Sequence, residues 1–394
     1  MNALLALLLL AAPDIQPPLP TPEMRGLWVV RTALVSPAAV DRVVDEAQRA
    51  GFNALFVQVR GRGDAFYRSA LVPRSEMLAA QPDSFDPLAR LMSRARTRAL
   101  QVHAWMNVLL CAGLGRFLPA GHAAAAHPEW LMVPRAAARA ALAARGGALR
   151  ALVAVSPGPD AEGLYLSPSA PEVADHLETV VREMLKAYPV DGVHFDFVRY
   201  PGPDYDYSRA ALEGFAGRVG RSLDLLAPPA QSPAEWAAYR REVLTALVAR
   251  LSRAARDERP RLLVSAAVVP DEAQAVALKF QDWPEWMAQG RLDAVCPMAY
   301  TADSRLFQEL IRDTRARVGP SRPLWAGVGA YRLDVDGVIE KVQLARAAGA
   351  SGVIVFSNES LRPPDLDRLR QGAFAIAVVM RPDATGATEG GRPR

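Results

Sequence analysis

The sequence predicts an α/β protein built as one (β/α)8 barrel, a single catalytic domain with long loops after the third and fourth strands. Short apolar runs alternate with longer amphipathic segments along most of the chain, which is typical of strands that alternate with helices. Most of the runs are continuously apolar, as expected for parallel strands buried on both faces. No glycine-rich phosphate loop follows the first run, which argues against a dinucleotide-binding sheet.

Eight runs qualify as strands. They begin at Arg25 (RGLWVVR), Asn53 (NALFVQVRGRGDAFY), Leu100 (LQVHAWMN), Asp191 (DGVHFDF), Arg261 (RLLVSAAVV), Leu292 (LDAVCPMAY), Pro323 (PLWAGVGAY) and Ser351 (SGVIVFSNES). Eight strand-like runs separated by helical segments favour a closed barrel over an open sheet.

The helical segments carry recognisable ends. Ser36 is a good N-cap, Pro37 suits the first helical position, and Gly51 suits the end of the same helix. Further helices are expected from Asp86, from Ser169, from Ser232 and in the stretch VDGVIEKVQLARAAGA that precedes the last strand.

Two connections, 107–167 and 200–231, are too long to be ordinary loops. Each follows a predicted strand, so in a barrel both would lie on the catalytic face and shape a substrate cleft.

The ends of the chain differ from its middle. We expect a signal peptide over 1–12, a proline-rich linker over 13–23, a barrel over 24–375 and a disordered tail over 381–394. The first apolar run is too short to span a bilayer, which needs about 20 residues. We therefore expect an exported protein, periplasmic or secreted, without stable membrane insertion.

Composition narrows the class of partner. The net charge is +4, but the chain has only three lysines, and its arginines are spread along helices beside acidic residues. No basic stripe forms, so nucleic acid is not an expected partner. Cys111 and Cys296 are the only cysteines and make no disulfide framework.

Polar residues gather where the predicted strands end, the position at which barrel enzymes carry their chemistry. Residues that alternate along one strand share a face, which groups His103 with Trp105 and Asn107, and His194 with Asp196. The candidate substrate-binding residues are Trp28, Gln58, Arg60, His103, Trp105, Asn107, His194, Arg199, Tyr200, Tyr300 and Trp325.

Aromatic side chains with a few carboxylates, amides and arginines are typical of a carbohydrate cleft. Glycoside hydrolysis needs two carboxyl groups, one as acid and one as nucleophile or base. Asp196 is the first candidate, because an unpaired carboxylate in a buried strand is costly. Glu359 and Asp64 are candidates for the second group.

Structural interpretations remain open beside these. Arg60 with Asp64, or Asp196 with Arg199, would also make ion pairs that close the top of a barrel, and Glu359 suits the start of the last helix. The two tryptophans Trp28 and Trp105 and the two histidines His103 and His194 would also suit a core. A mixed metal site of His103, His194 and Asp196 is geometrically possible, but no zinc motif is present and no cofactor is expected.

The quoted strand ends, together with HPEWL, LYLSPSAPEVADHLETVVREML and WAAYRREVLTALV, resemble the glycosyl-hydrolase-like family 10 group over about residues 24–371. The resemblance implies an exported barrel glycosidase, and peptide-free peptidoglycan strands as a substrate. It also implies that Asp196 is the fourth-strand carboxylate that acts as nucleophile or base. In such a cleft Arg60 and Arg199 would bind hydroxyl, acetamido or lactyl groups.

The chain departs from that pattern in two places. Phe197 follows Asp196 where many members have a second aspartate, and the fifth strand ends in AAVVPD without a carboxylate inside it. The general acid is therefore open. Two alternatives to a glycosidase follow, a non-catalytic glycan-binding barrel and a metal-dependent hydrolase such as a deacetylase.

Overall fold

The computed structural model describes residues 23–376 except 116–117, 120, 159 and 221–222. The expected signal peptide, nearly all of the expected linker and the expected tail lie outside these residues. None of the helices in the described ranges has the length and apolarity needed to cross a membrane.

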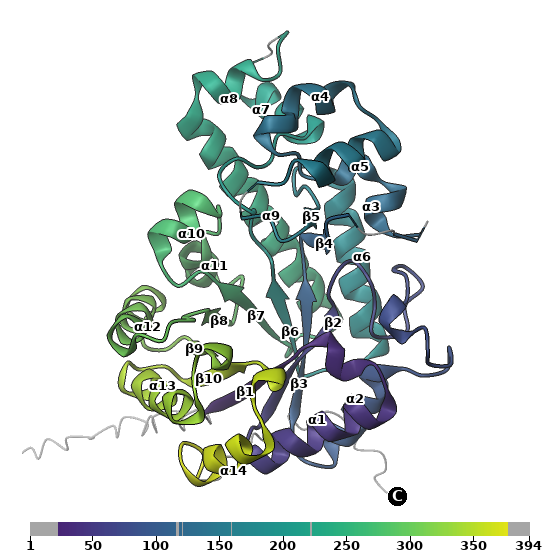
Figure 1. Ribbon diagram of the computed structural model, residues 1–394. Coiled ribbons are helices and arrows are strands. Elements are labelled where there is room, and N and C mark those ends of the chain that lie inside the picture. Colours follow the sequence, from purple (N-terminus) through teal and green to yellow (C-terminus); the bar gives the residue numbers. More distant parts are fainter. Residues whose placement is uncertain (1–22, 116–117, 120, 159, 221–222, 377–394) are drawn as a thin grey trace, which may run out of the picture.

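Eight parallel strands form the barrel, and all eight predicted runs are confirmed (Figure 1). In sheet order around the barrel they are β1 (Met24–Val29), β2 (Ala54–Arg60), β3 (Gln101–Asn107), β6 (Gly192–Asp196), β7 (Leu263–Val268), β8 (Ala294–Pro297), β9 (Trp325–Gly329) and β10 (Gly352–Phe356). Parallel bridges from Val295 to Leu324 and from Met298 to Gly327 join β8 to β9 and close the circle. The fold is therefore a (β/α)8 barrel, as the sequence predicts.

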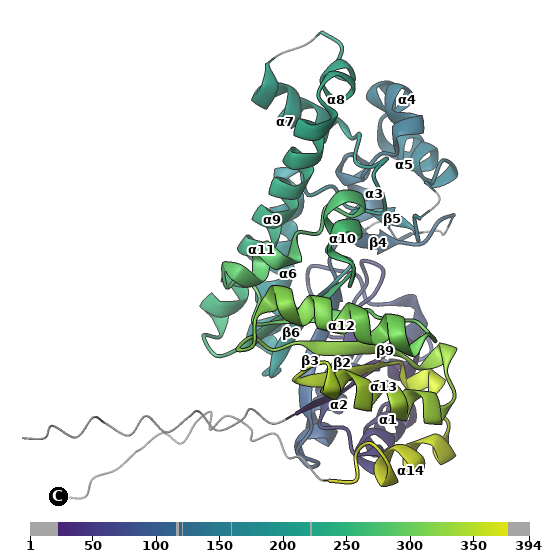
Figure 2. The ribbon, with the colours of Figure 1, turned by 90° about the vertical axis from the view of Figure 1, so that its left-hand side faces the viewer.

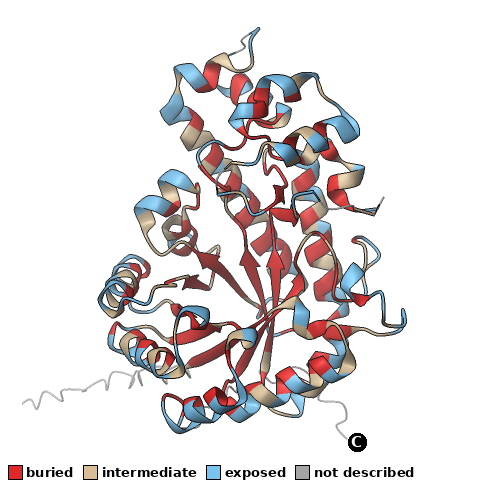
Figure 3. Ribbon diagram, in the orientation of Figure 1, coloured by how far each residue is buried: buried red, intermediate tan, exposed pale blue. Residues whose placement is uncertain are grey.

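Helices surround the strands. They are α1 (Pro37–Ala50), α2 (Pro87–Arg96), α6 (Pro171–Ala187), α9 (Pro233–Glu258), α10 (Glu272–Leu278), α11 (Trp283–Ala288), α12 (Ser304–Val318), α13 (Val335–Ala347) and α14 (Pro363–Gln371). The ends of α1 follow the sequence: the Ser36 hydroxyl accepts a hydrogen bond from the Ala39 N–H, and Gly51 adopts a left-handed φ of 87°. Figure 3 shows strands buried along nearly their whole length and helices with one buried face.

Large side chains fill the barrel interior. Trp28, Phe56, Trp105, Trp325 and Ile354 belong to one buried cluster contributed by five strands. The His103 ring also fits into this interior, because Gly192 on β6 has no side chain. A β-carbon at Gly192 would lie only 2.1 Å from Nδ1 of His103. The interior is therefore a packed core and offers a ligand access only at an end.

The two long connections form a lobe beyond the carboxyl ends of β3 and β6 (Figures 1 and 2). Rather than open loops, they contain β4 (Leu110–Ala112), α3 (Ala123–Ala126), α4 (Ala138–Ala143), α5 (Gly146–Val155), β5 (Leu164–Tyr165), α7 (Arg209–Val219) and α8 (Ala227–Gln231). The buried Asp206 joins the two connections, because its carboxylate accepts hydrogen bonds from the N–H groups of Val133, at 3.0 Å, and Ser208, at 2.7 Å. The lobe thus overhangs the barrel end where catalysis is expected.

Candidate functional site

Asp196 lies at the barrel mouth, as the last residue of β6 and opposite Asn107 of β3 in the parallel register. His194 and Asp196 share the inward face of β6, as the alternation of the strand predicts. Of all the residues in the eight barrel strands, Asp196 is the only aspartate or glutamate. It is thus the one strand residue there that can supply a carboxylate to the mouth.

Two donors hold the Asp196 carboxylate. Its Oδ1 accepts a hydrogen bond from the Phe197 N–H at 2.6 Å and another from Nη1 of Arg199 at 3.0 Å. The backbone of Phe197 turns into the left-handed region, with φ at +50°, and the Arg199 guanidinium lies 4.2 Å from the centre of the Phe197 ring. The predicted pairing of Asp196 with Arg199 is therefore present, and it fixes the position of Asp196.

A second carboxylate that the sequence analysis did not single out lies nearby. Glu162, in the lobe, makes an ion pair with Nη2 of Arg199 at 4.0 Å. Tyr165 of β5 interacts electrostatically with Arg199, Glu162 and Asp196, and its burial raises the pKa of its phenol, so the hydroxyl stays neutral. Burial would lower the pKa of Arg199, but the nearby carboxylates of Asp196 and Glu162 raise it, so the guanidinium stays charged.

The floor beneath Asp196 consists of buried rings. Burial lowers the pKa of both His103 and His194 to about 3, so both imidazoles are neutral. His194 Nδ1 lies 2.9 Å from the Ser265 hydroxyl, and His103 stacks on Phe56 with ring centres 4.5 Å apart. These histidines have the core role that the sequence left open.

Two of the predicted tryptophans support this floor. Trp28 packs edge to face against the rings of His194, Trp105 and Tyr300. Trp105 Nε1 donates to Oδ1 of Asn107 at 2.9 Å, and Asn107 Nδ2 donates to the Gly61 carbonyl at 2.8 Å. Asn107 is therefore fixed beside the mouth by both of its amide atoms.

Three predicted binding residues do not line the mouth. Arg60 is fully buried and donates from Nη1 to the carbonyls of Asn107 and Val108. Tyr200 is also fully buried, with its ring 5.1 Å from that of Phe280. Trp325 is the first residue of β9, so it lies at the opposite end of the strand from the mouth. The structure gives all three packing roles.

The aromatic wall at the mouth consists of the predicted residue Tyr300, which follows β8, with Tyr331, which follows β9, and Phe356 at the end of β10. Tyr300 stacks on Phe356 with ring centres 5.6 Å apart, and Tyr331, which is 52% exposed, lies 6.0 Å from Tyr300. Burial raises the pKa of Tyr300 well above its usual value. Tyr331 is thus the exposed ring of this wall, and the alternation from Ile354 to Phe356 is the signal that indicates Phe356.

The two candidate second carboxylates lie on the rim. Oδ1 of Asp64 accepts from the Arg62 N–H at 2.8 Å, and the exposed Glu359 accepts from the Thr32 hydroxyl. Asp64 faces a shallow hollow whose lining also includes Arg31, Arg62, Arg74 and His122. Gln58 is buried in β2 and accepts from Nη1 of Arg31, which lines the same hollow, at 3.2 Å.

Among the described residues, no three histidine, cysteine, aspartate or glutamate side chains are arranged to hold a metal ion. His103, His194 and Asp196 therefore do not form the mixed metal site considered from the sequence.

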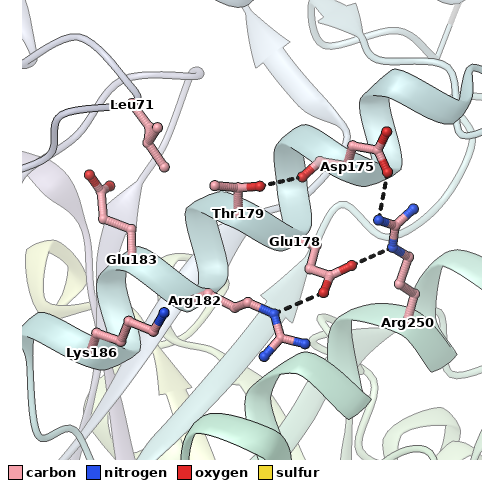
Figure 4. A pocket seen from close by; sticks show the side chains of 8 residues that line it. All are labelled: Leu71, Asp175, Glu178, Thr179, Arg182, Glu183, Lys186 and Arg250. Atoms are coloured by element: carbon pink, nitrogen blue, oxygen red, sulfur yellow. Dashed lines mark hydrogen bonds and ion pairs between the residues drawn. The ribbon is translucent and has the colours of Figure 1, made fainter.

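A second hollow lies on the outer surface of the barrel, along α6 and α9 (Figure 4). Its charged side chains pair with one another: Glu178 accepts from Arg182 at 2.8 Å and from Arg250 at 2.5 Å, and Arg250 also contacts Asp175 at 2.6 Å. We call Asp175, Glu178, Arg182 and Arg250, together with the residues that they pair with on α9, the outer cluster. It lies on the helix layer rather than at the strand ends, so it is not the candidate active site.

Curated proteins resemble this chain at low identity. Glycosyl hydrolase YngK of Bacillus subtilis (strain 168) is 24% identical over 323 residues, 74% of this chain and 55% of that protein. Glycosyl hydrolase DigH of Escherichia coli (strain K12) is 24% identical over 367 residues, 80% of this chain and 75% of that protein. The chain thus spans about half the length of YngK and three quarters of DigH.

Solved structures share the fold. The PgaB (BpsB) glycoside hydrolase domain from Bordetella bronchiseptica superposes with a TM-score of 0.67 at 16% identity, covering 89% of this chain and 98% of that one. Alpha-L-fucosidase isoenzyme 2 from Paenibacillus thiaminolyticus gives 0.61 at 14% identity, covering 90% and 49%.

The model of the family described as Glycosyl hydrolase-like 10 matches residues 23–320, which include β1 to β8 and the whole lobe. This match supports a hydrolase that acts on glycans. With about three quarters of its length matched, the chain belongs to the glycosyl hydrolase-like 10 family.

Proposed function

We propose that the protein hydrolyses glycosidic bonds in a cell-wall or extracellular polysaccharide, with Asp196 as nucleophile or general base. One observation carries the proposal: Asp196 is the only carboxylate residue of the barrel strands, and it lies at the carboxyl end of the fourth strand. That end is where barrel enzymes hold their catalytic groups. Membership of a glycosyl hydrolase-like family supports the same class of reaction.

Peptide-free peptidoglycan strands are the first substrate to test. The half-exposed Tyr331 offers a ring face to a sugar, and the amides of Gln58 and Asn107 lie beside the mouth. Arg62 and Arg74 line the rim hollow and would meet an acidic group such as the lactyl carboxylate of muramic acid. Arg60, which the sequence suggested for that role, is fully buried.

The test compares the wild type with Asp196→Asn on purified, peptide-stripped glycan strands, with products identified by mass spectrometry. We expect soluble sugar fragments from the wild type and a loss of at least ~10⁴-fold in the variant, as for other catalytic nucleophiles. Circular dichroism would establish that the variant is folded. Equal rates would remove Asp196 from the reaction.

A glycan-binding barrel without catalysis is the second candidate. The observation that favours it is the pairing of Asp196 with Arg199, which leaves the Asp196 side chain only 10% exposed. If both proteins pellet with the strands and neither releases sugar, this candidate replaces the hydrolase.

Such polymers lie outside the cytoplasm, so we also propose that the chain is exported, with residues 1–12 as the signal peptide. N-terminal sequencing of the protein recovered from its producing cell would test this, and an intact N-terminal methionine would contradict cleavage.

A further inference from the structure

Glu162 belongs to a short segment of the lobe that is held against the barrel. The Glu162 carbonyl accepts from Nη1 of Arg62 at 2.9 Å, which ties this segment to the loop after β2. The next residue, Gly163, approaches β4 so closely that a β-carbon would lie 2.0 Å from the Ala112 carbonyl oxygen. Any larger residue would push the segment away, so the position of Glu162 is set by its backbone.

Glu162 and Asp196 are joined through one arginine. Nη1 of Arg199 lies 3.0 Å from Oδ1 of Asp196, and Nη2 lies 4.0 Å from Oε1 of Glu162. Because both nitrogens belong to one planar guanidinium, the two carboxylate oxygens lie no more than about 9 Å apart. Retaining glycosidases hold their carboxyl groups about 5 Å apart and inverting ones about 6.5–9.5 Å apart. This upper limit is compatible with the separation of a hydrolytic pair.

The two carboxylates differ in their exposure and in the contacts that hold them. The Asp196 side chain is 10% exposed and is held by two donors, whereas the Glu162 side chain is 56% exposed and has one long ion pair. An exposed ion pair is weak, because water screens both charges. Glu162 can therefore leave Arg199 when a sugar enters, while Asp196 stays in place.

We propose that Glu162 is the second carboxyl group of the hydrolytic pair and acts as the proton donor. The inference rests on the proposed function. Protonated Glu162 gives its proton to the glycosidic oxygen as the bond from that oxygen to C1 breaks, and ionised Asp196 bonds to C1. A water molecule then attacks C1 and gives its proton to Glu162, and Asp196 is released. If Asp196 acts as a base instead, it takes the proton of a water that attacks C1 directly.

The carboxylates chosen from the sequence have different surroundings. Asp64 Oδ1 accepts a hydrogen bond from the N–H two residues before it, and Glu359, on η6 (Asn358–Ser360), accepts one from the Thr32 hydroxyl. Arg199, by contrast, forms ion pairs with Asp196 and Glu162. Contact with the arginine that fixes Asp196 distinguishes Glu162 from both.

The experiment measures turnover of peptide-stripped glycan strands across a pH range for wild type, Glu162→Gln, Glu162→Asp, Asp196→Asn and Asp160→Asn. Asp160→Asn is the matched control, since Asp160 lies in the same segment and makes an exposed ion pair with Lys279 at 3.1 Å. We expect Glu162→Gln to lower kcat by ~10²–10⁴-fold and to remove the alkaline limb of the pH profile, because that limb reports loss of the acid's proton. Glu162→Asp should regain part of the rate, and Asp160→Asn should match the wild type.

The outcomes separate the two proposals. If the wild type is active, Asp196→Asn is inactive and Glu162→Gln keeps the wild-type rate and profile, the role of Glu162 is overturned and the hydrolase stands. A slower Glu162→Gln that keeps the alkaline limb also overturns it, since that result indicates a structural effect. A wild type that releases no sugar overturns both.

Discussion

The barrel mouth and the outer cluster both bring arginines and carboxylates together, yet they differ in burial and in origin. At the mouth, Arg199 and Asp196 lie three residues apart at the end of a strand, and their side chains are 13% and 10% exposed. In the outer cluster, Arg182 contacts Glu178 one helical turn away and Asp257 and Glu258 on α9, with its own side chain 28% exposed.

This difference teaches that charge pairing alone does not mark a functional site. Helix faces spaced by four residues form exposed ion pairs readily, and each contributes only about 0–1 kcal/mol. A buried pair at a strand end must instead offset the desolvation of two charges, and removing one partner costs about 3–5 kcal/mol. The larger outer hollow is thus the less informative one.

The largest effect should come from removing the arginine at the mouth, and a smaller one from removing an arginine of the outer cluster. Arg199→Met leaves Asp196 as a buried carboxylate with one remaining donor, so we expect a loss of about 3–5 kcal/mol in the free energy of unfolding. Arg182→Met should cost about 1 kcal/mol, because water reaches the carboxylates that it leaves. Urea denaturation of both variants measures the two values.

A double variant makes the comparison sharper. Adding Asp196→Asn to Arg199→Met removes the stranded charge, so most of the lost stability should return. Equal losses for Arg199→Met and Arg182→Met, or no recovery in the double variant, would contradict the view that burial separates the two regions.

Much of the fold could be predicted, because continuous apolar runs and helix caps are local signals. Ser36 caps α1 and Asp86 caps α2, each accepting from the N–H three residues later. The content of the lobe could not be predicted in this way. Its helices are short and alanine-rich and are held by distant contacts, such as that of Asp206 with the Val133 N–H.

The site was predictable where strand alternation held. His194 and Asp196 on β6 point inward together. On β2, however, the register shifts between Gln58 and Arg60, so that Arg60 pairs with Met106, which belongs to the larger hydrophobic cluster. An extra residue in a strand moves the side chains that follow to the other face, and no composition signal announces it. The expectation that Trp325 lines the mouth failed for a simpler reason, because Trp325 begins its strand rather than ending it.

The proximity of Glu162 to Arg199 is the clearest example of a contact that the sequence does not predict. Glu162 lies 34 positions before Asp196 in an irregular segment, and only the folded lobe brings it to Arg199. Local periodicity carries no information about such a contact.

The buried histidines beneath the mouth predict a pH effect that the outer cluster lacks near neutrality. The pKa of His194 falls to about 3 in the folded state, against its ordinary value of 6.5. The unfolded chain therefore binds the extra proton first as the pH drops, so the stability due to neutral His194 is present above pH 6.5 and is lost progressively toward pH 3.

Between pH 7 and pH 5 this amounts to about 2 kcal/mol for one histidine. His194→Gln keeps a polar partner for Ser265 but does not titrate, so its unfolding free energy should fall by about 2 kcal/mol less than that of the wild type over this range. Urea denaturation at the two pH values measures the difference. Parallel decreases in wild type and variant would contradict a buried, neutral His194.

The smallest expected effect concerns salt and the outer cluster. Hydrogen bonds from Arg250 and then Arg182 lower the pKa of Glu178, so its charge is favoured in the folded state. Glu178→Gln should cost at most about 1 kcal/mol at low ionic strength, and this cost should vanish in 1 M NaCl, where the Debye length is about 3 Å.

The cost of Arg199→Met should persist in the same salt, because ions do not screen a buried pair to the same degree. Urea denaturation of both variants at the two ionic strengths measures this difference. If 1 M NaCl abolished the cost of Arg199→Met, salt would screen the charges at the mouth as fully as those of the helix layer. The argument that Arg199 holds Asp196 in place for catalysis would then lose its physical basis.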